Sequence, residues 1–385
     1  MNILVLTLNY IPDLSAGSFR VTALVEALRQ APQCSVDVVT ALPNRYSGFC
    51  PKIQEDPEGF NIHRIALPQH KGTLISQVRA YRHFIAGVLD YTKNKHYNCV
   101  VASSSRLMTA VLGAIIAKKT RAKLYLDIRD IFAESLPDVL PLKLGYALKP
   151  LLSCLERWAI GRADRVNLVS EGFLEYFQKR YPKRSFTCWT NGVDSEFCSL
   201  SSKQPGPILN ILYAGNIGLA QGLHLIVPQL AKRLEHRARF TLIGSGNGLR
   251  KLTRELEKQR VDNVDLLPPQ ERKTLVESYE NADILFLHLT TQKAFLKVLP
   301  SKLFEYAATG KPIWAGLAGY AARFVSSQIE NAALFDPENV EQALSALDRL
   351  NRESTPRTDF VARYSRETLS RQIAKDIIDV SKQSV

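Results

Sequence analysis

One acidic side chain stands in a context suited to binding a ribose. Glu305 belongs to the stretch LPSKLFEYAATGKPI at 299–313, which follows an apolar strand predicted at 284–287. A carboxylate can accept hydrogen bonds from two vicinal hydroxyls, and the amides that begin a helix attract phosphate oxygens. The residues predicted to contact such a nucleotide are Ser301, Lys302, Leu303 and Glu305. The alternative is an ordinary amphipathic helix with a glutamate on its surface.

Three glycine-containing loops follow predicted strands, at 9–17, 213–222 and 244–248. Because glycine lets the backbone approach a ligand closely, we predict that these loops help to bind the nucleotide. The residues predicted to do so are Gly17, Asn216, Gly218 and Gly244. The alternative for each loop, taken alone, is that it forms only a tight turn. None carries a GxGxxG fingerprint with a well-placed acidic residue or a Walker A lysine, which disfavours a Rossmann dehydrogenase and a P-loop enzyme.

A second group of charges ends the strand predicted at 124–127. The sequence DIRDIFAE at 127–134 places carboxylates and an arginine next to a core, where charges must pair or contact a ligand. We predict that Asp127 and Asp130 are catalytic residues that orient a sugar hydroxyl or the attacking acceptor in the cleft between two domains. The alternative is a structural Asp–Arg pair. Among the histidines, which lack metal-ligand spacing, only His288 at a strand end is a candidate for a functional role.

The elements that must position these residues alternate between strand and helix. A chain of 385 residues exceeds the size of a single hydrophobic core, which predicts two domains. Apolar strands alternate with amphipathic helices in residues 1–200 and again in residues 208–355. This pattern predicts an α/β fold with right-handed βαβ units and a parallel sheet in each domain. A linker is predicted between them, and a charged tail at 356–385 is expected to fold back over the first domain.

One segment of the first domain combines apolar and basic residues at helical spacing. Residues 140–163 carry Leu, Trp and Tyr, with Lys143, Lys149 and Arg157 interleaved. We predict a pair of helices that face the core. The alternative is a helix that lies on a membrane surface.

The chain is basic in both halves. It carries a formal net charge of +13, with 25 Lys and Arg against 17 Asp and Glu in residues 1–200, and 25 against 20 in the remainder. An anionic membrane face, a phosphorylated substrate or a merely solvated surface would each account for this charge. No zinc finger, RNA-binding aromatic pair or basic tail supports a nucleic-acid partner. The six cysteines lack CxxC spacing, as is typical of reduced cytoplasmic thiols, and the N-terminal strand lacks a signal peptide's basic leader.

Five motifs together resemble those of the family-four retaining glycosyltransferases, whose GT-B fold has two facing Rossmann-like domains. They are Asn9-Tyr10-x-Pro12 with Gly17, Asp127-x-x-Asp130, NGVD at 191–194, YAGNIG at 213–218, and PSKLFEY at 300–306 with GKP at 310–312. The resemblance covers most of the chain. Within the family, the chain most resembles WbuB-like transferases of N-acetyl-L-fucosamine, which act in O-antigen and capsule assembly.

The chain also departs from the pattern of this family. The family usually has two glutamates separated by seven residues, and here the second is Glu305 while the first position is Lys297. The arginine and lysine that usually grip the diphosphate fall on Asn216 and Gln221. Phosphate charge must then be met elsewhere, and the candidates are Lys302, Lys297, Arg20 and helix N-terminal amides.

The resemblance implies a reaction and its partners. A UDP-sugar would donate an N-acetylated amino sugar to a polyprenyl-diphosphate-linked glycan acceptor, with retention of configuration and no required cofactor or metal. The enzyme would be cytoplasmic and peripheral on the inner face of the plasma membrane. Two other readings stay open: a nucleotide-sugar 2-epimerase, and a non-catalytic member of the fold that binds a sugar or a partner protein.

Overall fold

The chain forms two compact units. The computed structural model describes residues 1–43, 61–68, 74–104, 106–131, 142–198, 200 and 206–383. Unit 1 contains Met1–Asn191 and Arg366–Val385, and unit 2 contains Gly192–Ser365. The chain therefore passes from unit 1 to unit 2 after Asn191, ahead of the predicted linker, of which residues 201–205 lie outside the described residues.

Unit 1 is built on a parallel sheet of seven strands in the order β3-β2-β1-β4-β5-β6-β7. The strands are β1 (Asn2–Leu6), β2 (Ser35–Ala41), β3 (Asn61–Ile65), β4 (Cys99–Ser104), β5 (Lys123–Ile128), β6 (Arg165–Leu168) and β7 (Phe186–Thr187). The central strands are buried on both faces, which explains their near-continuous apolar sequences. The two edge strands, β3 and β7, were not predicted, because they are short and lack a long apolar run.

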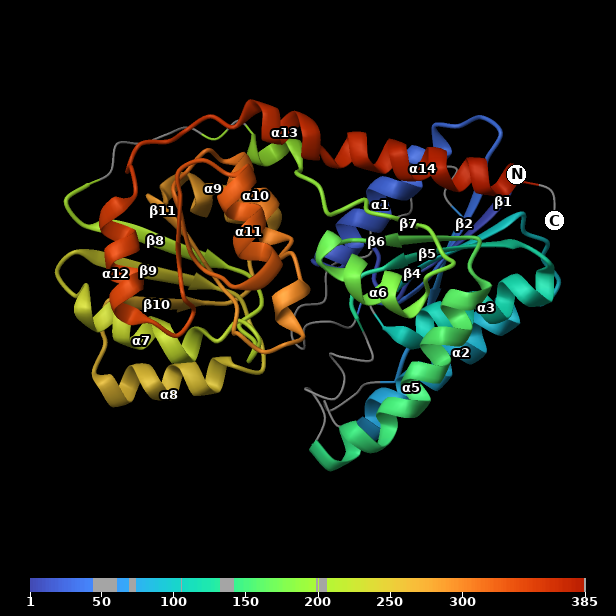
Figure 1. The fold of residues 1–385 in the computed structure, drawn as a ribbon, viewed down its shortest axis with the longest axis horizontal. Coiled ribbons are helices and arrows are strands. Elements are labelled where there is room, and N and C mark those ends of the chain that lie inside the picture. The colour runs from blue at the N-terminus through green and yellow to red at the C-terminus, as the bar shows by residue number, and fades with distance from the viewer. Residues whose placement is uncertain are drawn as a thin grey trace. The chain divides into compact units, whose positions relative to one another are not determined.

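Helices cover both faces of this sheet (Figure 1). They are α1 (Ala16–Arg29), α2 (Leu74–Tyr91), α3 (Leu107–Thr120), α5 (Leu142–Arg162), α6 (Leu174–Arg180) and α14 (Arg366–Lys382), with the short 3-10 helix η1 (Glu171–Phe173). On one face α1 and α14 pack on Ile3, Val5 and Val101, while Gly113 of α3 lies against Ala102 on the other face.

The predicted tail divides between the two units. Residues Thr358–Tyr364 form α13, whose Phe360 belongs to the core of unit 2. The next helix, α14, packs along α1 in unit 1 and buries Ile373 and Ile377. Burying one such side chain contributes about 1.5–3 kcal/mol, which explains why the last part of the chain returns to the first sheet.

The pair of helices predicted at 140–163 is instead one helix, α5. It continues through Pro150, where a backbone hydrogen bond must be missing. The helix runs beside α3 (Figure 1), and its buried Ala159 and Ile160 supply an apolar face. Packing against α3 stabilises this single helix despite the proline in its interior.

Unit 2 repeats the architecture with six parallel strands in the order β10-β9-β8-β11-β12-β13. The strands are β8 (Leu209–Ala214), β9 (Ala238–Ile243), β10 (Val264–Leu267), β11 (Ile284–His288), β12 (Ile313–Gly316) and β13 (Ala332–Phe335). The helices are α7 (Leu223–Arg233), α8 (Leu249–Gln259), α9 (Arg272–Asn281), α10 (Lys302–Ala308), α11 (Gly319–Gln328), α12 (Val340–Arg349) and α13, with 3-10 helices η2 (Ser195–Phe197) and η3 (Phe295–Lys297).

On the central strands of unit 2, alternate residues enter two separate cores. On β8, Leu212 and Ala214 pack with α9, α10, α11 and α13, whereas Ile211 and Tyr213 pack with α7, α8 and α12. Figure 1 shows these two groups of helices on opposite sides of the sheet. Both units are thus doubly wound α/β structures, which confirms the predicted fold class. Within the described part of the chain, every helix is too short or too polar to cross a membrane.

Candidate functional site

The strand order of unit 2 reverses between β8 and β11, the neighbouring strands at the centre of its sheet. In open α/β sheets, ligands bind at such a switch point, outside the carboxyl ends of the strands. The loops that follow β8 and β9, at 215–222 and 244–248, lie on this edge, and α10 begins there. Most of the residues predicted to bind a nucleotide therefore come together in unit 2.

The two glycine loops of unit 2 are in direct contact. The amide of Gly215 donates to the carbonyl of Ile243 over 2.9 Å, and the amide of Gly248 donates to the carbonyl of Ile217 over 2.9 Å. Gly244 has a φ of 149°, and a Cβ there would lie 1.8 Å from the carbonyl oxygen of Gly215. Only glycine fits at 244, because a side chain would push the two loops apart.

Gln221 organises the loop after β8. Its side-chain oxygen accepts from the amide nitrogen of the Asn216 side chain at 2.9 Å and from the backbone amide of Gly218 at 3.2 Å. The side chain of Asn247, from the other glycine loop, accepts from the amide of Leu219 at 3.0 Å. Asn216 and Gln221 thus bond to each other where the family usually has cations, and they shape the loop rather than offer charge.

Glu305 is buried, with an exposed fraction of 5 %. One of its carboxylate oxygens accepts from Lys302 at 2.8 Å and from the hydroxyl of Tyr279 at 3.1 Å. The other oxygen lies 4.0 Å from the guanidinium of Arg272. The alternative of a surface glutamate is therefore wrong, because this carboxylate lies inside the unit among cationic and hydroxyl groups.

Of the predicted residues next to Glu305, Lys302 and Ser301 are half-buried, whereas Leu303 belongs to the core. Lys302 reaches from Glu305 toward the loop after β8, since its Cε would lie 3.8 Å from a Cβ built on Gly215. Ser301 is half-buried at the start of α10. The side chain of Leu303 lies in the core instead, and its amide donates to the carbonyl of Pro300 at 3.1 Å. Any contribution of Leu303 to a ligand would have to come through its backbone.

Two residues of this site, Arg272 and Tyr279 on α9, were missed from the sequence. The guanidinium of Arg272 donates to Asp194 and to Glu196, and it lies 4.4 Å from the centre of the Phe197 ring. Burial opposes the charge of Arg272, but the nearby carboxylates of Glu305, Asp194 and Glu196 raise its pKa above the ordinary value. Burial and Glu305 raise the pKa of Tyr279 well above its usual range. Only their spatial neighbours distinguish these two side chains from other residues of an amphipathic helix.

Asp127 lies in unit 1 at the end of β5, with an exposed fraction of 1 %. Its two oxygens accept from Arg20 at 2.9 and 3.0 Å, from Asn167 at 2.8 Å and from Ser103 at 3.2 Å. Burial alone would raise the pKa of Asp127, but Arg20 and Asn167 hold it below the ordinary value. Four protein donors thus occupy this carboxylate, which favours the structural Asp–Arg pair over direct contact with a substrate.

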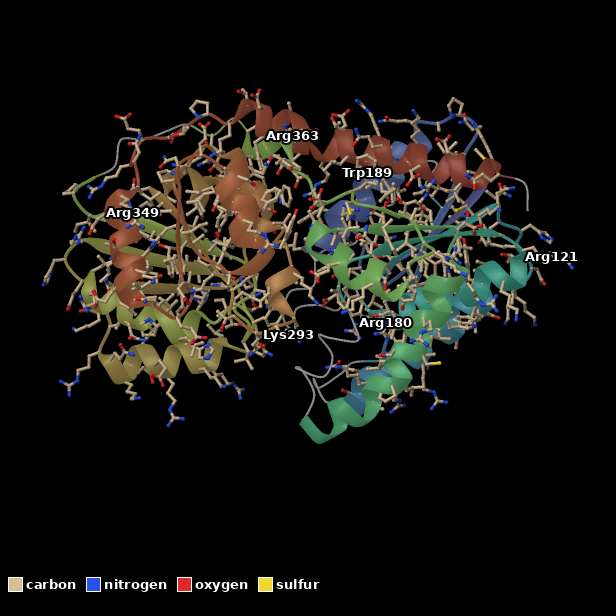
Figure 2. All side chains as sticks on the ribbon, viewed as in Figure 1. Arg121, Arg180, Trp189, Lys293, Arg349 and Arg363 are labelled. Carbon is tan, nitrogen blue, oxygen red and sulfur yellow. The ribbon has the colours of Figure 1, made fainter. Side chains whose placement is uncertain are left out.

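The guanidinium of Arg20 is held in the same hydrogen-bond network. Besides Asp127, it donates to the carbonyl of Trp189 at 2.8 Å and to that of Thr190 at 2.5 Å. Trp189, labelled in Figure 2, lies beside α14 in unit 1 and packs against its core. The expectation that Arg20 grips a phosphate is therefore wrong, because the guanidinium is buried and donates to Asp127 and to these carbonyls.

The remaining predicted residues are less enclosed. Asp130 is half-buried just after β5, and its carboxylate accepts from the amide of Ile131 at 2.8 Å. Gly17, in the first turn of α1, lies against the side chain of Arg129, because a Cβ there would meet the guanidinium at 2.0 Å. Lys297 lies in η3 and is half-buried. Among the described residues, no three His, Cys, Asp or Glu side chains are arranged as metal ligands.

Two doubly wound units, with glycine loops and a buried carboxylate at the ligand edge of the second, are the architecture of a GT-B glycosyltransferase. Comparison of the sequence with protein families identifies the domains. Residues 202–367 match the family of glycosyl transferases group 1, and residues 16–186 match the glycosyl transferase 4-like domain. The two matches account for most of the chain, which is therefore a glycosyltransferase of the GT-B type, as the family resemblance implied.

One curated relative and several solved structures are similar over nearly the whole chain. The relative is described as a colanic acid biosynthesis glycosyl transferase, WcaI, of Escherichia coli (strain K12), and is 23% identical, with 98% of this chain and 100% of the relative covered. The structures are sucrose-phosphate synthase from Thermosynechococcus elongatus (TM-score 0.70, 14% identity, 99% and 96% covered), Anabaena HepE in complex with UDP (0.67, 14%, 98% and 100%) and the lipopolysaccharide-biosynthesis glycosyltransferase WaaG (0.66, 16%, 99% and 97%). At these identities the structures bear on the fold alone.

Proposed function

We propose that the protein transfers a sugar from a UDP-sugar to a hydroxyl of a glycan acceptor, with retention of configuration. The observation that carries this proposal is Glu305, buried beside Lys302 next to the contacting glycine loops of unit 2. A carboxylate there can accept from the ribose hydroxyls, while Lys302 and loop amides face the diphosphate. The solved complex of the structural neighbour HepE with UDP supports UDP as the first nucleotide to test.

The proposed reaction exchanges one bond at the anomeric carbon. The bond from this carbon to the diphosphate oxygen breaks, the acceptor oxygen bonds to the same face, and the departing phosphate oxygen takes the acceptor proton. The products are the glycoside and UDP. The chain would act by positioning both substrates and by stabilising phosphate charge. Asp130 is the residue we propose to orient the acceptor hydroxyl, and we assign no cofactor or metal to the reaction.

We further propose that the sugar is an N-acetylated amino sugar such as N-acetyl-L-fucosamine, and that the acceptor is a polyprenyl-diphosphate-linked glycan in bacterial surface polysaccharide synthesis. The descriptions of WcaI, in colanic acid biosynthesis, and WaaG, in lipopolysaccharide biosynthesis, support this class of product. No nucleic-acid partner is part of the proposal.

Melting of the purified protein with UDP, GDP or dTDP tests the proposed donor. A ligand that binds only the folded state at about 100 times its Kd stabilises it by about 2.7 kcal/mol. We expect UDP alone to raise the melting temperature by about 5 °C or more. The absence of a shift with any nucleotide would favour a non-catalytic binding protein. Release of an altered UDP-sugar without acceptor would instead identify a 2-epimerase.

We also propose that the enzyme is cytoplasmic and attaches to the inner face of the plasma membrane through α5. In this helix Leu151 is 56 % exposed, and the basic residues Lys149, Arg157 and Arg162 are exposed as well. Such a surface suits an anionic bilayer. In flotation with phosphatidylglycerol vesicles, we expect Leu151→Asp to lower the bound fraction several-fold, and the matched variant Leu225→Asp on α7 to leave it unchanged. Equal binding to neutral vesicles would contradict the proposal.

A further inference from the structure

The imidazole of His288 lies beneath the loop at 215–222, at the carboxyl end of β11. It is fully buried. Its Nδ1 lies 2.6 Å from the carbonyl oxygen of Gln221, and its Nε2 lies 2.7 Å from that of Pro337. A carbonyl oxygen only accepts hydrogen bonds, so each contact needs a proton on the ring nitrogen, and a neutral imidazole carries one proton. The two contacts together fit the imidazolium form.

The surroundings of the ring prevent it from turning away. The rings of Phe286 and Phe335 flank it, each with its centre 6.2 Å from that of the imidazole. A Cβ on Gly316 of β12 would lie 2.4 Å from the imidazole Cδ2, and Gly222 above the ring adopts a φ of 60°. Both glycines leave room for the imidazole, and the ring therefore keeps both carbonyl contacts.

His288 acts on the glycine loop through Gln221. The backbone of Gln221 is held by the imidazole, and its side chain binds the Gly218 amide and Asn216. The neighbouring carbonyl of Ala220 accepts from the amide of Thr290 at 2.9 Å and from its hydroxyl at 3.2 Å. The end of β11 thus fixes two consecutive carbonyls of the loop.

Several groups act on the charge of the ring. Burial lowers the pKa of His288 below its ordinary value, although the carbonyls of Gln221 and Pro337 oppose this effect. Glu338, on the loop after β13, raises the pKa, and His224 on α7 lowers it. The imidazolium is therefore populated only as the pH falls through this lowered value, which lies on the acid side of the ordinary histidine pKa of about 6.5. Opening of the loop with the ring still buried would remove a carbonyl contact and lower the pKa of His288 further, so within the buried site protonation and the observed loop conformation favour each other.

We propose that protonated His288 locks the loop at 216–222 in the conformation that receives the donor diphosphate. In this role the imidazolium also supplies positive charge where Asn216 and Gln221 replace the family's usual cations. His288 is then a positioning residue, since it acts through Gln221. The inference rests on the proposed function and names the group, a diphosphate, that this loop meets.

Calorimetric titration with UDP at pH 5.5 to 8.5 tests this coupling in the full chain and in His288→Gln, with His236→Gln, at an exposed position of the same unit, as a matched control. We expect the affinity ratio of wild type to His288→Gln to be about tenfold at pH 5.5 and to shrink toward unity at pH 8.5, as one charge-assisted hydrogen bond is lost. The ratio cancels the titration of UDP itself. A ratio that does not vary with pH would overturn the coupling, because a purely structural role gives that result.

Histidine-selective nitrogen NMR of the wild type provides a second readout that needs neither a variant nor a nucleotide. The His288 ring can be assigned by its proximity to the Phe286 and Phe335 rings. We expect both nitrogens to carry protons at pH 5.5, and a neutral ring at that pH would overturn the inference. If UDP fails to bind the wild type, the proposed function fails, while this spectrum still decides the protonation state.

Discussion

Replacement of Glu305 by alanine is expected to weaken UDP binding about 100-fold while the protein stays folded. The carboxylate is the proposed acceptor for two ribose hydroxyls, and hydrogen bonds to a charged group contribute about 1.5–3 kcal/mol each. The change leaves Lys302 and Arg272, whose side chains are 24% and 22% exposed, in contact with water. The hydroxyl of Tyr279, which is fully buried, loses its acceptor, so we expect a loss of folding stability of about 1–3 kcal/mol. Isothermal calorimetry and thermal melting measure the two quantities separately.

Glu341→Ala is a suitable control for this experiment. Glu341 lies on α12 of the same unit and forms an exposed ion pair with Arg233. Such pairs contribute about 0–1 kcal/mol, so this variant should bind UDP like the wild type and melt close to it. Unchanged UDP affinity in Glu305→Ala would remove the ribose role from Glu305. The UDP affinity of Glu305→Gln, which keeps one acceptor oxygen, should lie between those of the wild type and Glu305→Ala.

Replacement of Asp127 by alanine is expected to destabilise unit 1 by about 3–5 kcal/mol, because it leaves the buried guanidinium of Arg20 without its carboxylate. Urea unfolding followed by hydrogen exchange of peptides from β1 and β5 should show this loss, while peptides from β8 and β11 keep their protection. A catalytic role alone would leave stability unchanged and abolish turnover. The experiment therefore separates the two hypotheses made for this residue.

Asp130→Ala is the matched comparison, since Asp130 is half-buried at the end of the same strand. We expect it to unfold like the wild type and to lose turnover if this carboxylate orients the acceptor. Acid provides an independent check on Asp127. Its pKa is lower in the folded state than in the unfolded chain, so its stabilising contribution is present above about pH 4 and is lost as the pH falls through the lowered value. Asp127→Ala should flatten that part of the pH profile of unfolding.

The candidate site at the carboxyl edge of the unit 2 sheet was largely predictable from the sequence. Apolar strands alternate with amphipathic helices, and in parallel sheets the loops after the strands must gather on one edge. Gly218, Gly244 and Glu305 follow strands in this pattern, so their approximate location needs no coordinates. What the pattern left open was whether Glu305 is exposed, because a seven-residue helix carries little periodic information.

The partners of the charged residues were not predictable in this way. Arg272 and Tyr279 join Glu305 from α9, a helix whose sequence gives no sign of a site. Asp127 and Arg20 are 107 residues apart, and their pairing depends on α1 lying beside the end of β5. A carboxylate at the end of a buried strand is equally compatible with catalysis and with an internal ion pair until its neighbours are known.

The sequence by itself determined the two-unit α/β architecture, the glycine loops and the acidic residue at the ligand edge of unit 2. It did so because strand and helix periodicity and glycine placement are local properties of the chain. The tertiary structure alone decided that Arg20 pairs with Asp127, that α5 is one helix, and that His288 faces two carbonyls. These features depend on contacts between distant segments, whose burial and geometry set the energy of each charge and hydrogen bond.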